Sequence, residues 1–396
     1  MMNGRPTRTP AARVDPPSPG RLRPRNVAVG VILVACVLGG VVLSVVLAGR
    51  APGVTALFSP QATVSAGQRP ARSNQPAVPA GRKVPPPRSG QVYWGGFASG
   101  IPRRQPLAAL IRRAGQRPAI VMWYQDWSNN LSFPAQAARR LAGLGIVPMI
   151  TWEPWKPPKV PGTPSAVQPR YRLARITAGA FDRYLTRYAR EIKRYGGPVM
   201  LRPFHEMDGY WYPWGGTANG NRPQDFVPAW HHVHDLFARL GVHNVTWVWS
   251  VNATSVPLSP HNTPEEYWPG RRYVDWIGIS GFNFGNSRSF GTWVSFDTLF
   301  KARIAELRRY HKPIVLTEIS STEVGGDKAA WIKQTFSRLD GYPIVGAVIW
   351  YDHRDSRLED WRIRSSQAAQ GAFRRAIAAR NVRSAPAAFR AATTAR

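Results

Sequence analysis

The stretch 201–214, LRPFHEMDGYWYPW, concentrates residue types that can do chemistry. Glu206 stands there among several aromatic rings, shortly after an apolar run. A second carboxyl group, Glu318, closes another apolar run, PIVLTE. Two carboxyl groups on opposite sides of a glycosidic bond can cleave it, one as acid and base and the other as nucleophile. Glu206 and Glu318 are therefore candidate catalytic residues, and the rings are candidate surfaces for a sugar.

Two groups so far apart in the sequence need a fold that brings distant segments together. From residue 91 onward, short apolar runs alternate with longer segments of helical periodicity. Strands that are apolar on both faces and alternate with helices indicate a parallel sheet. Eight such units favour an α/β fold of the (β/α)8 TIM barrel type. A doubly wound open sheet is the alternative, but no Gly-rich phosphate turn follows any run. The expected strands are 92–97, 119–125, 147–152, 199–204, 245–251, 274–281, 313–318 and 344–350.

A (β/α)8 barrel collects the carboxyl ends of its strands at one rim, where the active sites of this fold lie. Nearly every expected strand ends in an aromatic ring, a carboxyl group or both. Rings can stack on sugars, and polar side chains can hydrogen-bond sugar hydroxyls. The candidate substrate-binding residues at these ends are Asp126, Trp152, Glu153, Arg202, His205, Phe282 and Asn283.

Together with MITWEPW, VDWIGISGFNFG and VIWYDH, the two carboxyl segments resemble glycoside hydrolase family 26 over roughly residues 92–360. That family consists of retaining (β/α)8 enzymes, mainly β-mannanases, with β-1,3-1,4-glucanases and a few β-1,3-xylanases. The resemblance implies that Glu206 is the general acid/base and that Glu318 is the nucleophile. It also implies that His205 helps to position the two carboxylates. We expect no metal or cofactor to take part.

The resemblance further assigns aromatic platforms and exposes two departures from the family's pattern. Trp350 is expected beneath the sugar whose bond is broken, and Trp211 and Trp214 are expected to flank the neighbouring subsites. Phe282 stands where the family usually has a tyrosine that hydrogen-bonds the nucleophile. Asp208 stands where asparagine is common, and we expect its negative charge to raise the pKa of the neighbouring acid.

Other interpretations of these residues have less support. Phe282 alone favours a non-catalytic barrel that binds carbohydrate at the cell surface. The pair His205-Glu206 is not a zinc motif, because no second histidine follows at helical spacing. A cluster on a predicted helix, at positions 231, 232 and 234, consists of histidines that we expect at the surface or in packing rather than around a metal.

The net charge of +31 first suggests a polyanionic partner. Its distribution weakens that suggestion, because no block of five or six basic residues appears and no nucleic-acid-binding signature is present. We therefore expect no nucleic acid as a partner. An anionic wall or membrane surface could still hold the domain nearby, and a basic scaffold for a wall polymer is an alternative for which charge is the only argument.

The segment 26–49 is uncharged over 24 residues, which is enough for one transmembrane helix. Six arginines precede it, so the positive-inside rule keeps the N-terminus in the cytoplasm and exports the chain beyond residue 50. A cleaved signal peptide, which would yield a secreted protein, and a lipoprotein with its lipid on Cys36 are the alternatives. All three interpretations export the domain.

The expected domain organisation follows the changes in amino-acid composition along the chain. It comprises a basic cytoplasmic tail (1–25), a transmembrane anchor (26–49), a disordered Pro/Ala/Gly-rich linker (50–90), a catalytic domain (91–380) and a flexible C-terminal tail (381–396). The expected function is that of an exported, membrane-tethered, endo-acting β-glycosidase. Its expected partner is a polysaccharide substrate, with β-mannan as first choice and β-1,3/1,4-glucan as second. A tethered single domain needs no second subunit, so a monomer is expected.

Overall fold

The computed structural model of the protein describes residues 82–158, 165–356, 358–379 and 381–384. The expected cytoplasmic tail, the anchor with Cys36, most of the linker and most of the C-terminal tail lie outside these residues. Among the helices that the structure describes, none is long and apolar enough to cross a membrane.

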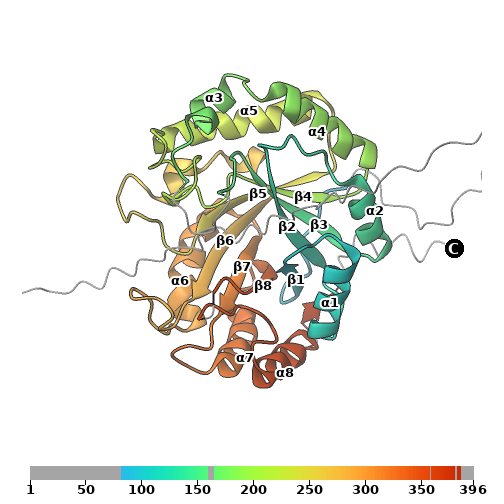
Figure 1. The fold of residues 1–396 in the computed structure, drawn as a ribbon, viewed down its shortest axis with the longest axis vertical. Coiled ribbons are helices and arrows are strands. Elements are labelled where there is room, and N and C mark those ends of the chain that lie inside the picture. Colours follow the sequence, from blue (N-terminus) through green and yellow to red (C-terminus); the bar gives the residue numbers. More distant parts are fainter. Residues whose placement is uncertain (1–81, 159–164, 357, 380, 385–396) are drawn as a thin grey trace, which may run out of the picture. The chain divides into compact units, whose positions relative to one another are not determined.

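Eight parallel strands form a closed barrel at the centre of the described domain (Figure 1). Each strand pairs with the next one along the chain, and β1 pairs with both β2 and β8, which closes the ring. The predicted (β/α)8 TIM barrel is confirmed, and every expected strand overlaps an observed one. The strands are β1 (Val92–Ala98), β2 (Ile120–Asp126), β3 (Val147–Glu153), β4 (Val199–Pro203), β5 (Val245–Asn252), β6 (Trp276–Asn283), β7 (Ile314–Ser321) and β8 (Val345–Asp352).

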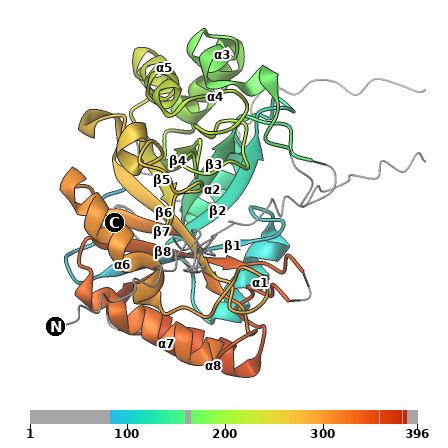
Figure 2. The ribbon, with the colours of Figure 1, turned by 90° about the vertical axis from the view of Figure 1, so that its left-hand side faces the viewer.

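Helices cover the outside of the barrel (Figures 1 and 2). In α4, for example, Leu185, Tyr188 and Ile192 are buried, and their spacing of three and four residues gives the helix one apolar face toward the strands. The α-helices are α1 (Arg104–Ala114), α2 (Ala135–Gly143), α3 (Leu173–Thr177), α4 (Asp182–Tyr195), α5 (Phe226–Arg239), α6 (Phe296–Leu307), α7 (Lys328–Arg338) and α8 (Gln367–Ile377). Short 3-10 helices span Pro169–Tyr171, Pro223–Asp225, Pro264–Tyr267, Arg271–Tyr273, Arg308–Tyr310 and Leu339–Gly341.

The segment 82–90, which composition assigns to the linker, packs against the beginnings of two strands. Only 3% of Val84 is exposed. Its backbone N–H donates to Oγ1 of Thr246 at 2.7 Å, and its carbonyl accepts from Nε1 of Trp276 at 3.0 Å. Because these partners begin β5 and β6, the segment lies at the end of the barrel opposite the candidate site. The packed domain therefore starts before residue 91.

The domain also extends past the expected boundary at residue 380. A short strand, β9 (Val382–Arg383), pairs in parallel with the first residues of β1, whereas β2 pairs with residues 95–97 of that strand. A strand has only two edges, and β8 occupies one edge of β1. β9 therefore covers the part of the other edge that β2 leaves free.

Candidate active site

Arg202 and Glu318 form a buried ion pair across the barrel interior. Nη1 of Arg202 donates to Oε1 of Glu318 at 2.5 Å, and at most 5% of either side chain is exposed. Arg202 also donates to Oγ1 of Thr151 at 3.3 Å and to Oγ of Ser280 at 2.7 Å. The guanidinium thus connects β4 with β3, β6 and β7, and it fixes Glu318 through a short, charge-assisted hydrogen bond.

A β-bulge in β7 turns Glu318 toward the barrel interior. Two consecutive residues of β6, Ile279 and Ser280, pair with Leu316 and Glu318 of β7, so Thr317 is an extra residue. Successive residues of a regular strand point to opposite faces, and a bulge interrupts that alternation. Oγ1 of Thr317 lies 3.3 Å from Oγ of Ser280 inside the barrel. Thr317 and Glu318 therefore face the same side, although they are neighbours in the sequence.

Glu206 lies on the turn after β4 in an unusual backbone conformation. Its φ angle is +56°, and that of Phe204 is +52°, in the left-handed region that residues with side chains rarely adopt. The N–H of Glu206 donates to the carbonyl of Ser250 at 2.8 Å, and Oε2 accepts from Nε1 of Trp211 at 3.0 Å. Strain of this kind, about 1–3 kcal/mol per residue, clusters at functional sites, where surrounding contacts must hold it.

The two carboxyl groups lie close to each other and differ in protonation. One oxygen of Glu206, one oxygen of Glu318 and a ring nitrogen of His205 all lie within 4.8 Å of one another. Burial, followed by the charge of Glu318, raises the pKa of Glu206 to about 8. At neutral pH Glu206 is therefore protonated, while Glu318 carries its charge beside Arg202. Such a pair can donate a proton and attack an electrophilic carbon at the same bond.

These three side chains are also the one group among the described residues whose atoms could together hold a metal ion. The guanidinium of Arg202 occupies Oε1 of Glu318, however, and its positive charge opposes a cation at that position. The donor set therefore fits a metal poorly. The expectation that the site needs no metal stays a prediction.

His205 and Glu153 lie beside each other, next to the two carboxyl groups. Burial, followed by the charge of Arg202, lowers the pKa of the His205 ring well below its ordinary value. Burial raises the pKa of Glu153 well above its ordinary value. Oε1 of Glu153 lies 3.9 Å from Nε2 of His205, and Oε2 accepts from Nε1 of Trp155 at 3.2 Å. Neither ring nitrogen of His205 has a hydrogen-bond partner among the described residues, so one can donate to a ligand hydroxyl and the other can accept.

Aromatic rings form an apolar wall around this polar centre. Phe282, 2% exposed, packs edge-on against Tyr351 with ring centres 5.3 Å apart and lies 5.0 Å from the ring of Trp361. Phe97 stacks on Tyr351 at 4.7 Å and meets Tyr124 edge-on at 5.1 Å. A wall of this kind excludes water and strengthens the electrostatic interactions inside it.

Known proteins resemble the part of the chain that builds this site. Residues 176–325, which carry both carboxyl groups, match the sequence profile of glycosyl hydrolase family 26. Endoglucanase H of Acetivibrio thermocellus is 34% identical over 289 residues, which are 72% of this chain and 30% of that protein. The mannan endo-1,4-beta-mannosidase of Bacillus subtilis strain 168 is 25% identical over 141 residues, or 34% of each chain. The chain belongs to glycosyl hydrolase family 26.

The fold of this family 26 chain has solved counterparts. One is the catalytic domain of a family 26 endo-beta-1,4-mannanase from Bacillus sp. JAMB-750, with a TM-score of 0.58, 16% identity, and coverage of 76% of this chain and 89% of that one. At that identity the likeness shows the fold alone. The family 26 chain spans about a third of the length of the curated relatives named above, so the activities in their names are those of longer proteins.

Two tryptophans expected to bind sugar lie outside the strand barrel of this family 26 member. Trp152 is fully buried and stacks on Tyr188 of α4, with ring centres 4.5 Å apart. The ring of Trp350 lies 5.1 Å from that of Phe373 in α8, and only 1% of the residue is exposed. Because strand residues alternate, the inward position belongs to Tyr351, the next residue. Both tryptophans pack strands against helices instead of offering a face to a ligand.

Trp211 and Trp214 differ in their relation to the carboxyl groups of the family 26 site. Trp211 donates directly to Glu206, as described above, so it lies beside the reacting centre. Trp214 is fully buried, stacks on Tyr212 at 4.4 Å and donates from Nε1 to the carbonyl of His205 at 2.7 Å. Trp214 therefore stabilises the turn after β4, and it does not provide the subsite surface that we expected.

Asn283 and Asp126 hold loops at the rim. Oδ1 of Asn283 accepts from the backbone N–H of Val294 at 3.0 Å, and its Nδ2 donates to Oγ of Ser321 at 3.0 Å. Oδ1 of Asp126 accepts from the backbone N–H of Ser128 at 2.9 Å. The structure thus gives both side chains a role in loop conformation, and Asn283 is fully buried.

Asp208 organises the segment after β5 and does not face Glu206. Its Oδ1 accepts from Nδ2 of Asn252 at 2.8 Å, and its Oδ2 accepts from Oγ of Ser255 at 2.8 Å. Burial is the main cause that raises the pKa of Asp208, and the charge of Arg303 opposes it. The raised pKa of Glu206 has burial and Glu318 as its main causes. The expectation that Asp208 adjusts that pKa is therefore not supported.

The three histidines of α5 contact neighbouring side chains and backbone, as expected from packing residues. The ring of His231 stacks on that of Tyr273 at 3.8 Å. Nε2 of His232 lies 2.6 Å from Oδ1 of Asp182, and Nδ1 of His234 lies 3.1 Å from Oδ1 of the adjacent Asp235. These separate contacts do not bring the three rings around one point.

Four residues that line the family 26 site were not predicted from the sequence. They are Tyr124, Thr151, Ser280 and Tyr351. The first three stand two positions before a predicted site residue, and they therefore share its face of the strand. Strict two-residue alternation, counted backward from those predicted residues, could have found these three, whereas Tyr351 is the neighbour of the predicted Trp350.

Proposed function

We propose that this chain is an endo-acting β-glycosidase that hydrolyses a β-linked polysaccharide with retention of configuration. The supporting observation is the pair of Glu206, protonated at neutral pH, and Glu318, charged, with oxygens within 4.8 Å of each other. Retaining enzymes hold their two carboxyl groups about 5–5.5 Å apart, whereas inverting enzymes leave about 6.5–9.5 Å for a water molecule. The short separation favours retention.

In the first step of the proposed mechanism, Glu318 attacks the anomeric carbon while Glu206 gives its proton to the departing oxygen. The products are a glycosyl ester on Glu318 and a shortened chain with a new hydroxyl group. The ester has lost the negative charge that raised the pKa of Glu206, and Arg202 keeps its positive charge. The pKa of Glu206 therefore falls in the intermediate, and the ionised group can act as a base.

In the second step, Glu206 takes a proton from a water molecule while the oxygen of that water attacks the anomeric carbon. The bond to Glu318 breaks, and Glu318 recovers its charge beside Arg202. Two inversions at one carbon give net retention. We propose that His205 hydrogen-bonds sugar hydroxyls during both steps, with Glu153 beside it, because both ring nitrogens of His205 lack a partner among the described residues.

The proposed substrates are β-mannan and β-1,3/1,4-glucan. The family resemblance supports mannan, and the match to a mannan endo-1,4-beta-mannosidase agrees with it. The longer and more similar match is to a protein named as an endoglucanase, which supports glucan. Reducing ends released from a panel of β-mannans and β-glucans would separate the two.

The same assay tests the function itself when Glu206→Gln and Glu318→Gln are measured beside the wild type. We expect the wild type to shorten at least one polymer and both variants to lose at least about 1,000-fold in rate, as is usual when a group that acts in the transition state is removed. The alternative is a barrel that binds carbohydrate without cleaving it, as the missing hydroxyl at Phe282 would suggest. Equal binding by all three proteins with no shortening of any polymer would support that alternative.

We also propose that the chain is exported and stays at the cell membrane as a monomer, with residues 26–49 as a single-pass anchor. The uncharged segment and the arginines before it support this proposal. Protease added to intact cells should remove the barrel while leaving a short membrane-bound fragment. Release of the mature protein into the medium would instead support a cleaved signal, and loss of membrane attachment in Cys36→Ser would support a lipid anchor.

A further inference from the structure

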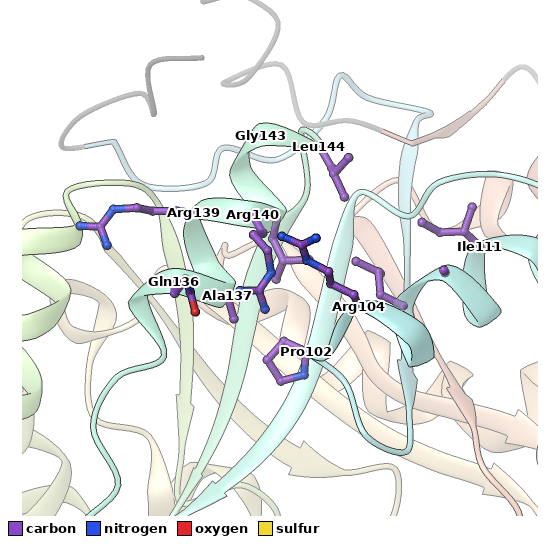
Figure 3. Close-up of a pocket in the computed structure, with 12 residues that line it drawn as sticks. Pro102, Arg104, Ile111, Gln136, Ala137, Arg139, Arg140, Gly143 and Leu144 are labelled. Atoms are coloured by element: carbon purple, nitrogen blue, oxygen red, sulfur yellow. The ribbon is translucent and has the colours of Figure 1, made fainter. Parts of the chain in front are cut away.

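A cavity of about 600 Å³ lies between α1 and α2, on the outer side of the barrel (Figure 3). Its volume falls within the range of small-molecule pockets, about 300–1,000 Å³. The residues that form its apolar lining are Leu107, Ala108, Ile111, Ala137, Leu141 and Leu144. These residues belong to the helical layer, whereas the two carboxyl groups lie inside the ring of strands.

Two guanidinium groups share this apolar cavity. Arg104 begins α1 and Arg140 lies in the last turn of α2, and Figure 3 shows both side chains extending into the space between the helices. Arg139 extends away from them in the same view. No carboxylate of the described residues forms a salt bridge with Arg104 or Arg140. Two like charges beside an apolar surface favour an anion between them.

The beginning of α1 adds to the positive potential, whereas α2 lines the cavity with both its first turn and its end. Neither α1 nor α2 has an acidic residue in its first turn, and neither has a side-chain cap. Arg104 and Gln136, both in first turns, line the cavity. The free N–H groups at a helix start carry a partial positive charge, which arginine reinforces instead of balancing.

The rest of the chain does not supply the missing negative charge. Among residues 1–81, 159–164, 357, 380 and 385–396, Asp15 is the only aspartate or glutamate. A segment from these parts of the sequence could cover the apolar lining, but its side chains, apart from Asp15, could not neutralise the arginines. The charge of the cavity therefore points to a ligand from outside the chain.

We propose that the cavity binds an anionic amphiphile, a molecule with a phosphate or carboxylate head and a hydrocarbon tail. The head pairs with Arg104 and Arg140, and the tail lies on Leu107, Ile111 and Leu144. Arginine forms two parallel hydrogen bonds to such oxyanions, and the apolar lining gains from contact with a tail. The ligand site is separate from the glycan site, so binding does not depend on Glu206 or Glu318.

Isothermal titration of the full chain with dodecyl phosphate, below its micelle concentration, tests the proposal. Dodecyl maltoside supplies a similar tail without the charge, and inorganic phosphate supplies the head without the tail. We expect saturable binding of dodecyl phosphate at one site, and binding at least about tenfold weaker for the other two probes. Equal binding of the maltoside would identify a merely apolar groove, and equal binding of phosphate would identify an anion site without a tail. Either result overturns the proposal.

Three variants locate the binding. The double variant Arg104→Gln/Arg140→Gln should weaken dodecyl phosphate by about tenfold or more, because it removes both charge-assisted contacts. Ala108→Glu places a carboxylate on the exposed face of α1, within the cavity lining, and should weaken binding similarly. The matched control, Arg183→Gln/Arg190→Gln, removes two exposed arginines of α4 and should bind as the wild type does. Uniform weakening in both double variants would mean nonspecific attraction to a basic surface. All variants should cleave glycan at the wild-type rate, which separates this site from the proposed catalytic one.

Discussion

The 2.5 Å contact between Nη1 of Arg202 and Oε1 of Glu318 determines how charge is distributed in the site. One guanidinium lies close to three buried carboxyl groups, and it bonds to only one of them. Burial raises the pKa of Glu206 to about 8, so this group keeps its proton at neutral pH, and burial also raises the pKa of Glu153 well above its ordinary value. The arrangement yields a charged group for attack and an acid for proton donation, with Glu153 beside His205.

Arg202→Met removes the guanidinium but keeps a long, unbranched side chain. We expect the free energy of unfolding to fall by about 3–5 kcal/mol, because the variant leaves a buried carboxylate without its partner. We also expect kcat/KM to fall at least about 100-fold, since Glu318 then holds its charge less well. Arg202→Lys retains the charge and should lose less on both measures. Wild-type activity in Arg202→Met would show that the ion pair is only structural.

The pH dependence of kcat/KM should report the proton on Glu206. Because the pKa of this group is raised to about 8, the free enzyme loses its acid as the pH rises above that value. We expect kcat/KM on a polysaccharide to fall about tenfold per pH unit in the limb above pH 8. An aryl glycoside with a good leaving group needs no acid, so Glu206→Gln should still cleave it. For this variant and substrate, the fall in kcat/KM above pH 8 should be absent. A limb that persists there belongs to another residue.

Glu206→Gln should also change how stability depends on pH. In the unfolded chain Glu206 loses its proton near pH 4.5, whereas in the folded protein it keeps the proton until about pH 8. The folded state binds more protons between these values, so this group's contribution to the free energy of unfolding decreases as pH rises through that window. Glutamine carries no such charge. We therefore expect Glu206→Gln to be more stable than the wild type at pH 8, and the difference to shrink toward pH 4.5, as measured by urea unfolding.

Tyr351 and Trp350 are adjacent in the sequence, but we expect replacement of the first to lower activity and replacement of the second to lower stability. Tyr351 faces the site beside Phe282, and Trp350 packs against α8. Replacing each by leucine gives a matched pair. Tyr351→Leu should lower kcat/KM at least about tenfold, because it removes part of the wall around the reacting centre. Trp350→Leu should lower the free energy of unfolding by about 2–4 kcal/mol, as large-to-small core substitutions do, and leave the kcat/KM of the folded protein within about threefold. The reverse pattern would restore Trp350 as the sugar platform.

The barrel and the two carboxyl groups could be predicted from the sequence because their signals are local. An apolar run between helical segments indicates a buried parallel strand, and a polar residue at its carboxyl end indicates the rim. This rule expected Glu206 and Glu318 at the rim, and the family resemblance supplied their separate roles. The segment around Val84 was assigned to the linker because its few apolar residues give no period, although one buried valine and two hydrogen bonds are enough to dock it.

The orientation of side chains at the rim could be predicted only in part. Alternation would have placed Tyr351 inside and Trp350 outside, whereas the family resemblance implied that Trp350 is the sugar platform. Glu318 presents the opposite case, because strict alternation would have turned it outward. The bulge at Thr317 has no sequence signal that we recognise, since it is defined by the pairing of β7 with β6. The bulge can be located only from the residue-by-residue pairing of β7 with β6.

Retention of configuration tests the central claim most directly. Proton NMR recorded during the first minutes of hydrolysis of a β-glucan or β-mannan oligosaccharide distinguishes the anomer that is released from the one that later forms by mutarotation. The wild type should release the β anomer first, and Glu318→Gln should release no product in the same time. Release of the α anomer first, or equal release by Glu318→Gln, would contradict the assignment of Glu206 and Glu318 to a double displacement.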